Sequence, residues 1–309
     1  MQRKIAFMGT PNFAVPVLKH IYQNGYEITV VYTQPPKKSK RGQKIEKSPI
    51  HLISETLSLN VRTPDKLREN NLEYEYIKNL NLDLVIVVAY GQILPKNLLS
   101  LSKKGFINLH ASILPKWRGA APIQRSIMNQ EKETGISVMK INEKLDEGDI
   151  SQILKINIIE NENAQSLSER LSALASENIS DIIENILSKK INFKPQNHSE
   201  ATYAKKIKKE EGLIDWNDSS ENIIGKINGL YPYPGGYFLF KGERYKILKA
   251  EKSFAKENPG KVLTNDLEIS CGTNSIKIIE IQREGKKSQK INEFLPGSQI
   301  KKGTNLLDV

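Results

Sequence analysis

A chain of 309 residues, of which 38% are hydrophobic and 26% charged, can form two domains of ordinary size and has the composition of a globular protein with a buried core. Its single cysteine, Cys271, excludes a disulfide framework and a cysteine-based metal site within the chain. No apolar run approaches the roughly 18 residues that a membrane-spanning helix needs, so we expect no membrane partner.

The net charge of +11 favours a polyanionic partner, because contacts to phosphates dominate the affinity of proteins for nucleic acids. A composition that is generally rich in lysine would give the same surplus without such a partner. Charge alone therefore leaves nucleic-acid binding open. The chain enters a strand-like run directly, with no long apolar stretch followed by a cleavage site, and we expect a cytoplasmic protein.

The first half of the chain alternates strands and helices, which is the pattern of a largely parallel α/β sheet. A strand, a helix and a second strand are predicted at 3–8, 12–24 and 27–33. The apolar run DLVIVVA at 83–89 is typical of a central strand covered on both faces. Further along, strands are predicted at 105–109, 135–141 and 150–158, and helices at 121–129 and 164–187.

The composition changes after residue 189, and a stretch rich in Lys, Asn and Pro predicts a linker at 190–206. An α/β domain is therefore expected over residues 1–189. Beyond the linker, a short helix at 219–228 and short strands separated by Gly, Asn and Lys turns predict a small β-barrel domain over 207–309. Its strands are expected at 236–240, 244–250, 261–263, 268–271 and 275–282.

Polar side chains end the predicted strand at 105–109. Open α/β sheets bind ligands outside the carboxyl ends of their strands, so the end of this strand is a candidate ligand site. Asn108 and His110 are two residues apart, and strand alternation directs both side chains to the same face. An amide and an imidazole placed together can polarise a carbonyl group and transfer a proton. The alternative, which stays open, is that both residues only satisfy backbone groups at the strand end.

A second polar cluster, LDEGD at 145–149, lies between two predicted strands, and its glycine permits a tight turn. A carboxylate there can orient the imidazole or assist its proton transfer. Acidic turn residues usually serve local hydrogen bonding, so the cluster is a weak signal by itself. The glycine that follows the first strand, Gly9, lacks the G-x-G-x-x-G pattern, and a dinucleotide cofactor is not supported.

The segment between residues 37 and 47 carries six cations against one acid, Glu46. Pro35, Pro36 and Gly42 oppose regular structure, so the sequence predicts a flexible basic loop. Such a loop can bind phosphates, although a solvated loop without a partner is the commoner case. The six cations are Lys37, Lys38, Lys40, Arg41, Lys44 and Lys47.

The segment HASILPKWRGAAPI at 110–123 closely resembles the formyltransferase family, in particular its members that act on methionyl-tRNA. Together with LDEGD, it is the most specific part of the resemblance. Other segments resemble the same family in the same order along nearly the whole chain. They are MGTPNFA at 8–14, KRGQKI at 40–45, AYGQILP at 89–95, AKKIKKEEGLIDW at 204–216 and YPYPGGYF at 231–238.

The resemblance implies a Rossmann-like catalytic domain followed by a C-terminal open barrel, similar to an OB fold, that binds tRNA. It implies transfer of a formyl group from 10-formyltetrahydrofolate to the α-amino group of methionine on initiator tRNA, without a metal.

The resemblance also implies three groups of site residues. The catalytic positions correspond to Asn108, His110 and Asp146. The stretch that contacts the folate corresponds to Ser112, Ile113, Leu114 and Pro115. The basic insertion that binds the acceptor arm of the tRNA corresponds to Lys37, Lys38, Lys40, Arg41 and Lys44.

Departures from the family pattern are small: Ile113 stands where leucine is usual, and Asn12 where aspartate is common. Three alternatives stay open: transfer to a nucleotide-linked amino sugar, hydrolysis of the formyl-folate, and a non-catalytic RNA-binding protein. A sugar substrate gives no reason for six cations in one loop, and the intact catalytic positions argue against a purely RNA-binding role.

Overall fold

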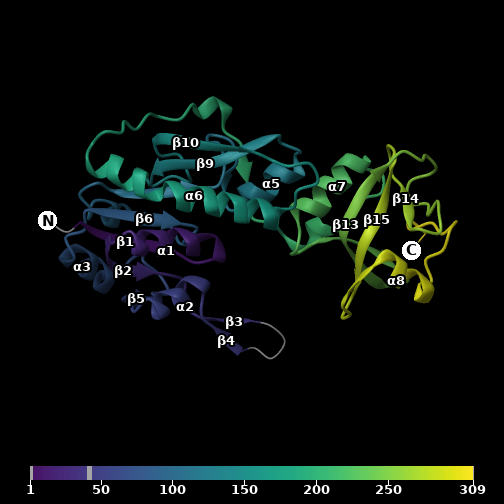
Figure 1. Cartoon of the computed structure of the whole chain (residues 1–309), viewed down its shortest axis with the longest axis horizontal. Helices are drawn as coiled ribbons and strands as arrows, with labels where there is room; N and C mark the ends of the chain where they lie inside the picture. The colour runs from purple at the N-terminus through teal and green to yellow at the C-terminus, as the bar shows by residue number, and fades with distance from the viewer. Residues whose placement is uncertain (1–2, 40–43, 309) are drawn as a thin grey trace. The chain divides into compact units, whose positions relative to one another are not determined.

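The computed structural model describes residues 3–39 and 44–308, without the side chains at positions 38, 39 and 44. These residues form two compact units (Figure 1). The first unit runs to Gly119 and includes Thr134–Ile156 and Ser168–Tyr203; the second contains Ala120–Glu133, Asn157–Leu167 and the residues from Ala204 onward. Within the described ranges, no helix has the length and apolar character needed to cross a bilayer.

A seven-stranded sheet forms the centre of the first unit. Five neighbouring strands run parallel, and one antiparallel strand pairs with the last of them. This arrangement confirms the predicted Rossmann-like, mostly parallel sheet. In spatial order the strands are β10 (Ile150–Asn157), β9 (Glu133–Lys140), β7 (Phe106–His110), β6 (Leu84–Val88), β1 (Lys4–Gly9), β2 (Glu27–Tyr32) and β5 (Val61–Arg62).

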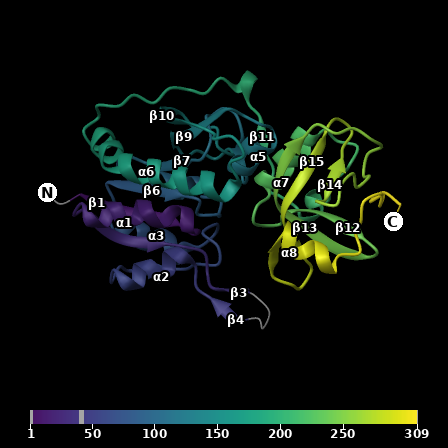
Figure 2. The same cartoon turned by 45° about the vertical axis from the view of Figure 1, so that its right-hand side comes forward.

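Helices cover both faces of this sheet. Alternate residues of β1 and β6 pack with Ile77 of α3 (Asn71–Asn79) and Leu98 of α4 (Lys96–Leu99) on one face. Figures 1 and 2 show α1 (Val15–Gln23) and α6 (Ala164–Leu187) side by side on the other. The Ser172 hydroxyl of α6 donates a 2.7 Å hydrogen bond to the Phe13 carbonyl just before α1. The helix predicted at 164–187 is confirmed, because its apolar residues recur at helical spacing and are largely buried.

The basic segment is more regular than the sequence predicts. Strands β3 (Lys37–Ser39) and β4 (Lys44–Glu46) pair antiparallel, with Lys37 opposite Glu46, so the prediction of an irregular loop is wrong for these residues. Pro35 and Pro36 precede the first strand and take no part in the ladder, which is why they do not prevent it. Figures 1 and 2 show this hairpin projecting from the sheet, ahead of α2 (Pro49–Thr56).

The second unit is the small all-β domain that the sequence predicts at the C-terminus, and its strands pair antiparallel. Its sheet has the order β12-β13-β15-β14, with β16 paired to β15. The strand predicted at 261–263 is wrong, since Lys261 and Val262 form only isolated bridges. Its strands and longer helices are α5 (Pro122–Met128), α7 (Ser220–Gly229), β12 (Gly236–Phe240), β13 (Glu243–Ser253), β14 (Glu268–Ser270), β15 (Ser275–Arg283), β16 (Ser288–Lys290) and α8 (Ile291–Phe294).

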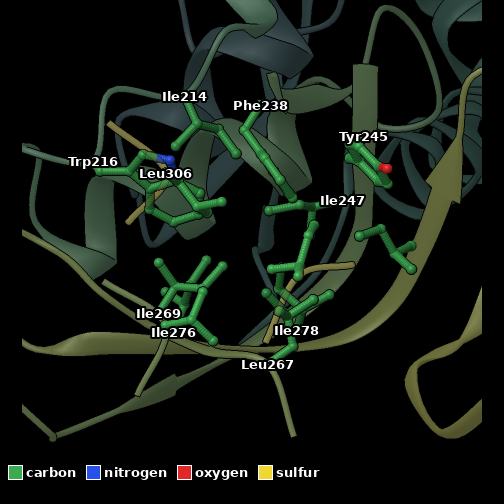
Figure 3. Close-up of a cluster of buried hydrophobic side chains, with 14 of the residues drawn as sticks. Ile214, Trp216, Phe238, Tyr245, Ile247, Leu267, Ile269, Ile276, Ile278 and Leu306 are labelled. Carbon is green, nitrogen blue, oxygen red and sulfur yellow. The ribbon is translucent and has the colours of Figure 1, made fainter. Parts of the chain in front are cut away.

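One apolar core holds the second unit together. Figure 3 shows Trp216, Phe238 and Tyr245 above a floor of isoleucines that includes Ile276 and Ile278 of β15. The rings of Phe238 and Tyr245 are stacked, with their centroids 5.4 Å apart. Because these residues alternate along their strands, the same strands direct every second side chain away from the core.

Short segments complete the secondary structure of the described residues. They are the strands β8 (Arg118–Gly119) and β11 (Tyr203–Ala204) and the 3₁₀ turns η1 (Asn12–Ala14), η2 (His198–Glu200), η3 (Lys209–Gly212) and η4 (Leu295–Gly297).

Candidate active site

Strand β7 carries Asn108 and His110 to the carboxyl edge of the parallel strands. Phe106, the first residue of the strand, belongs to the core on the face covered by α3 and α4. Alternation places Asn108 and His110 on the same face, further along the strand, as predicted. Asn108 is half-buried, and His110 is only 6% exposed. The imidazole is thus held in a largely dry position.

Both ring nitrogens of His110 face polar neighbours. Nε2 lies 3.0 Å from the Trp117 carbonyl oxygen, which can only accept, so this nitrogen carries a proton in the observed arrangement. Nδ1 lies 3.6 Å from the Asp146 carboxylate oxygen Oδ2. That distance exceeds a hydrogen bond, but catalytic contacts often tighten when substrate binds. The structure thus brings together the imidazole and the carboxylate that come from separate parts of the sequence.

Asp146 occupies the turn between β9 and β10 in an unusual conformation. Its φ of 50° lies in the left-handed region, which aspartate tolerates better than most residues. Its Oδ2 accepts a 2.9 Å hydrogen bond from the Gly119 amide. The sequence predicts that the glycine permits a tight turn. In the structure Gly148 instead allows a close approach to the neighbouring backbone, because a Cβ there would overlap the Lys140 carbonyl oxygen. The Gly119 amide therefore holds the carboxylate group, and the conformation of the turn fixes the backbone that carries it.

The buried side-chain amide of Gln196 holds the backbone of this turn in place. Gln196 donates two 2.8 Å hydrogen bonds from Nε2, one to the Asp146 carbonyl and one to the Gly148 carbonyl. Its Oε1 accepts from Arg118 Nη2 at 2.7 Å and Nε at 3.1 Å. Lys194 pairs with Ile150 at the start of β10, which places Gln196 beside the turn. Neither Arg118 nor Gln196 is among the site residues expected from the sequence.

Arg118 is 1% exposed and needs counter-charge in such a position. Its Nη1 lies 3.3 Å from Glu147 Oε1, on the same turn as Asp146. Its Nη2 lies 3.1 Å from His198 Nδ1, so the ring of His198 accepts there. The guanidinium therefore contacts the turn directly and through Gln196. No local sequence signal marks these partners, because they meet only in three dimensions.

Gln196→Leu should destabilise the first unit. The change leaves two backbone carbonyls and part of a buried guanidinium without partners, and such losses cost about 1–3 kcal/mol of unfolding free energy. Urea denaturation followed by tryptophan fluorescence measures the effect. Gln23→Leu makes the same chemical change on the exposed surface of α1 and should leave the midpoint in place. Equal midpoints for the two variants would show that the buried amide is dispensable.

The stretch expected to contact folate forms a tight turn after β7. The Ser112 hydroxyl is fully buried and donates a 2.6 Å hydrogen bond to the Lys116 carbonyl, so it shapes the turn. The Ser137 hydroxyl of β9 donates to the Ser112 carbonyl and accepts from the Leu114 amide. Leu114 is buried, whereas Ile113 and Pro115 are half-buried and keep accessible surface.

Asn108 is the uncommitted polar group of the site. Its side chain makes no hydrogen bond with any residue that the structure describes, although it lies two positions from His110 on the same strand face. Its amide can donate to an oxygen atom that enters beside the imidazole. A free amide donor, an imidazole and a carboxylate can together stabilise an oxyanion and move a proton.

The cations expected to bind tRNA are only partly described. Lys37 is exposed at the start of β3, and the backbones of Lys38 and Lys44 belong to the β3–β4 hairpin. Lys40 and Arg41 lie outside the described residues.

A cavity of about 410 Å³ lies at the opposite end of β7 from His110. It is lined by residues around the start of that strand, including Lys104, Phe106 and Lys140. It shares no residue with the cluster around His110, and we assign it no part in the chemistry of that cluster.

Comparison with known proteins gives matches along the chain. A family model described as Formyl transferase matches residues 3–183, and one described as Formyl transferase, C-terminal domain, matches residues 206–299. The methionyl-tRNA formyltransferase of Pelagibacter ubique is 63% identical over 310 residues, covering 100% of both chains. That of Caldanaerobacter subterraneus is 42% identical, covering 98% of this chain and 99% of the relative.

Solved structures show the same fold at lower identity. A sugar 3N-formyl transferase, WlaRD, has a TM-score of 0.71 and 20% identity, covering 93% of this chain and 100% of its own. A methionyl-tRNA formyltransferase from Clostridium thermocellum has a TM-score of 0.59 and 20% identity, covering 82% and 95%.

Proposed function

The chain belongs to the formyl transferase family, and we propose that it transfers a formyl group from a reduced folate to the amino group of methionyl-tRNA. The observation that carries this proposal is the 63% identity over the full length to a methionyl-tRNA formyltransferase. The cluster of Asn108, His110 and Asp146 adds the chemistry that such a transfer needs. The product is N-formylmethionyl-tRNA, which begins translation.

The formyl donor in this proposal is 10-formyltetrahydrofolate. The methionine amine attacks the formyl carbon, a C–N bond forms, and the carbonyl oxygen becomes an oxyanion. The free amide of Asn108 donates to this oxygen, and His110, protonated or polarised, stabilises the developing charge beside it. One such donor contributes roughly 3–4 kcal/mol to the transition state.

A proton must leave the attacking nitrogen as the new bond forms, and the folate nitrogen needs one when its bond to the formyl carbon breaks. Asp146 faces Nδ1 of His110 at 3.6 Å, so the pair can take up the first proton and return it. The Gly119 amide fixes the carboxylate throughout. The balance is then complete: the amine gains the formyl group, and tetrahydrofolate leaves with the proton.

The folate lies against the turn after β7 in our proposal. Because the Ser112 hydroxyl is committed to the Lys116 carbonyl, Ser112 contributes through its backbone. The accessible parts of Ile113 and Pro115 supply apolar contact to the folate, and the buried side chain of Leu114 anchors the turn in the protein interior. Replacement of the family's leucine by Ile113 preserves this kind of contact.

The tRNA contacts the basic hairpin through Lys37, Lys38, Lys40, Arg41 and Lys44, which supply positive charge to its phosphates. We assign catalysis to residues 1–189, the connection to 190–206 and further tRNA binding to 207–309. Because aminoacylated initiator tRNA is the acceptor, we place the protein in the cytoplasm.

The decisive experiment follows a labelled formyl group. With labelled 10-formyltetrahydrofolate, the full chain should formylate methionylated initiator tRNA rapidly and methionylated elongator tRNA slowly. Two further arms test the alternatives: a nucleotide-linked amino sugar as acceptor, and no acceptor at all. Label that moves to the sugar, or appears as free formate at the same rate without tRNA, would refute the proposal.

A further inference from the structure

The cavity at the start of β7 has the size of a site for a small molecule. Its volume of about 410 Å³ lies in the range of roughly 300–1,000 Å³ that is usual for such sites. All its lining residues belong to the first unit. Ligands of open α/β sheets usually bind at the carboxyl ends of the parallel strands, whereas this cavity lies at the amino end of β7. It is therefore separate from the cluster around His110.

The inner wall of the cavity is apolar. Phe106, the first residue of β7, and Ile186, near the end of α6, are 2% and 4% exposed. Leu99, Ile141 and Ile191 also line the cavity, and each is half-buried. An apolar group that binds against this wall removes both its own surface and that of the wall from water, which is favourable. The wall thus suits the apolar part of a ligand.

Gly105 leaves open space beside the backbone at the start of β7. Its φ of 84° lies in the left-handed region that favours glycine, and a Cβ built there would meet no atom within 4 Å. Its amide already donates to the Ser102 carbonyl, and its carbonyl accepts from the Val85 amide. Recognition of a ligand therefore depends on the side chains around this glycine.

Four lysines line the cavity, and no acidic residue from the described part of the chain does. Lys103 is neutralised, because its Nζ lies 2.7 Å from Asp83 Oδ1. The hydrogen bond from Lys103 lowers the pKa of the Asp83 carboxyl. Lys104, Lys140 and Lys189 form no ion pair with any residue that the structure describes. Three positive charges therefore remain available to an anion.

An aromatic ring holds one of these lysines in position. The Nζ of Lys140 lies 4.5 Å from the centroid of the Phe193 ring, which also lines the cavity. The next residue, Lys194, is fixed by two 2.9 Å backbone hydrogen bonds with Ile150. An ammonium group that is already ordered loses less side-chain entropy when it binds an anion.

The carboxyl end of α6 lies beside the cavity and carries partial negative charge, which opposes an anion. The Lys189 amide donates to the Ile186 carbonyl at 3.3 Å, and the Lys190 amide donates to the Asn185 carbonyl at 3.0 Å. These bonds satisfy two of the last carbonyls of the helix. The Lys189 side chain adds a full positive charge at the same place, so the balance of charge at the cavity is positive.

The cations of the cavity are all lysines. Arginine matches a planar carboxylate with two parallel hydrogen bonds, whereas lysine binds phosphate as a point charge. We propose that this cavity is a binding site for a small organic phosphate. The phosphate contacts at least two of Lys104, Lys140 and Lys189, and the apolar body of the molecule lies against Phe106 and Ile186. This site is independent of the proposed function and adds a second ligand to the first unit.

The test measures the binding of three probes to the full chain by isothermal titration calorimetry. Naphthyl phosphate carries a flat apolar body and a charge, naphthol carries the body alone, and inorganic phosphate carries the charge alone. Naphthyl phosphate should bind at least about tenfold more tightly than either of the others, because it uses both the wall and the lysines. If naphthol or inorganic phosphate binds equally well, one half of the site contributes nothing and the inference is wrong.

The variant Lys140→Met with Lys189→Met removes two of the free charges and keeps most of each stem. It should weaken the binding of naphthyl phosphate about tenfold, because hydrogen bonds to charged groups are the stronger ones. The matched control is Lys19→Met with Lys66→Met, which removes two exposed lysines of the same unit that lie outside the cavity. Its affinity should equal that of the wild type. An unchanged affinity in the cavity variant, or an equal loss in the control, would overturn the inference.

Ile191→Trp tests the cavity without changing its charge. The larger side chain fills part of the space and should weaken the binding of naphthyl phosphate about tenfold, while circular dichroism and thermal melting check that the variant is folded. Saturating tetrahydrofolate should leave the affinity of the wild type for naphthyl phosphate unchanged, because the cavity shares no residue with the cluster around His110. Unchanged binding in folded Ile191→Trp, or displacement of the probe by the folate, would place the probe elsewhere and refute the site.

Discussion

His110→Ala should lower kcat by about 10³–10⁴-fold, because the ring serves both proton transfer and charge stabilisation. The imidazole lies between the Trp117 carbonyl and the Asp146 carboxylate, and alanine reaches neither. The folate and tRNA do not depend on the ring for their positions in our proposal, so both KM values should change little. Single-turnover formyl transfer at saturating substrates measures the chemical step directly.

The control for this variant is His20→Ala. His20 is a half-buried residue of α1 that lies outside the site, and its loss should leave turnover unchanged. Circular dichroism and thermal melting check that His110→Ala is folded. Turnover within tenfold of the wild type in a folded His110→Ala preparation would remove the imidazole from the mechanism.

Asp146→Asn should also lower kcat by about 10³-fold or more, since removing the charge that faces a catalytic imidazole can cost up to about 10⁴-fold. Asparagine tolerates the left-handed backbone at this position, and its amide oxygen can still accept from the Gly119 amide. The substitution therefore removes the negative charge while keeping the turn. Steady-state kinetics with both substrates separates an effect on kcat from one on KM.

Asp149→Asn provides the comparison for charge, because it removes the same charge three residues away in the same segment. It should retain most of the activity. If the two variants lose activity equally, the effect comes from the overall charge of the turn, and the pairing of Asp146 with His110 has no special role.

Much of the fold was predictable, because long elements carry strong periodic signals. The buried β6 and the amphipathic α6 are examples: one is a continuous apolar run, and the other repeats leucine and isoleucine at helical spacing. The short α2, α3 and β5 are not predicted, because elements of two to nine residues carry too little periodicity to stand out from their surroundings. The β3–β4 hairpin was misjudged because Pro35 and Pro36 lie just outside its ladder.

The site was predictable where one strand or one motif carried it. Asn108 and His110 share a face through strand alternation alone, and the approach of Asp146 followed from the family pattern. The partners of Arg118 were not predictable, because Gln196 lies in a stretch without periodicity and reaches the turn only through the pairing of Lys194 with Ile150. The orientation of the Ser112 hydroxyl likewise depends on a turn whose geometry no sequence pattern specifies.

The hydrogen bond from Gln196 to the Asp146 carbonyl joins positions 50 residues apart. The intervening chain contains all of β10 and α6, so it forms one closed loop pinned at the site. Chimeras between relatives should therefore exchange this whole span as a block. A crossover inside it would combine Gln196 from one parent with the Asp146 turn from the other. The residues that position the carboxylate would then come from two different proteins.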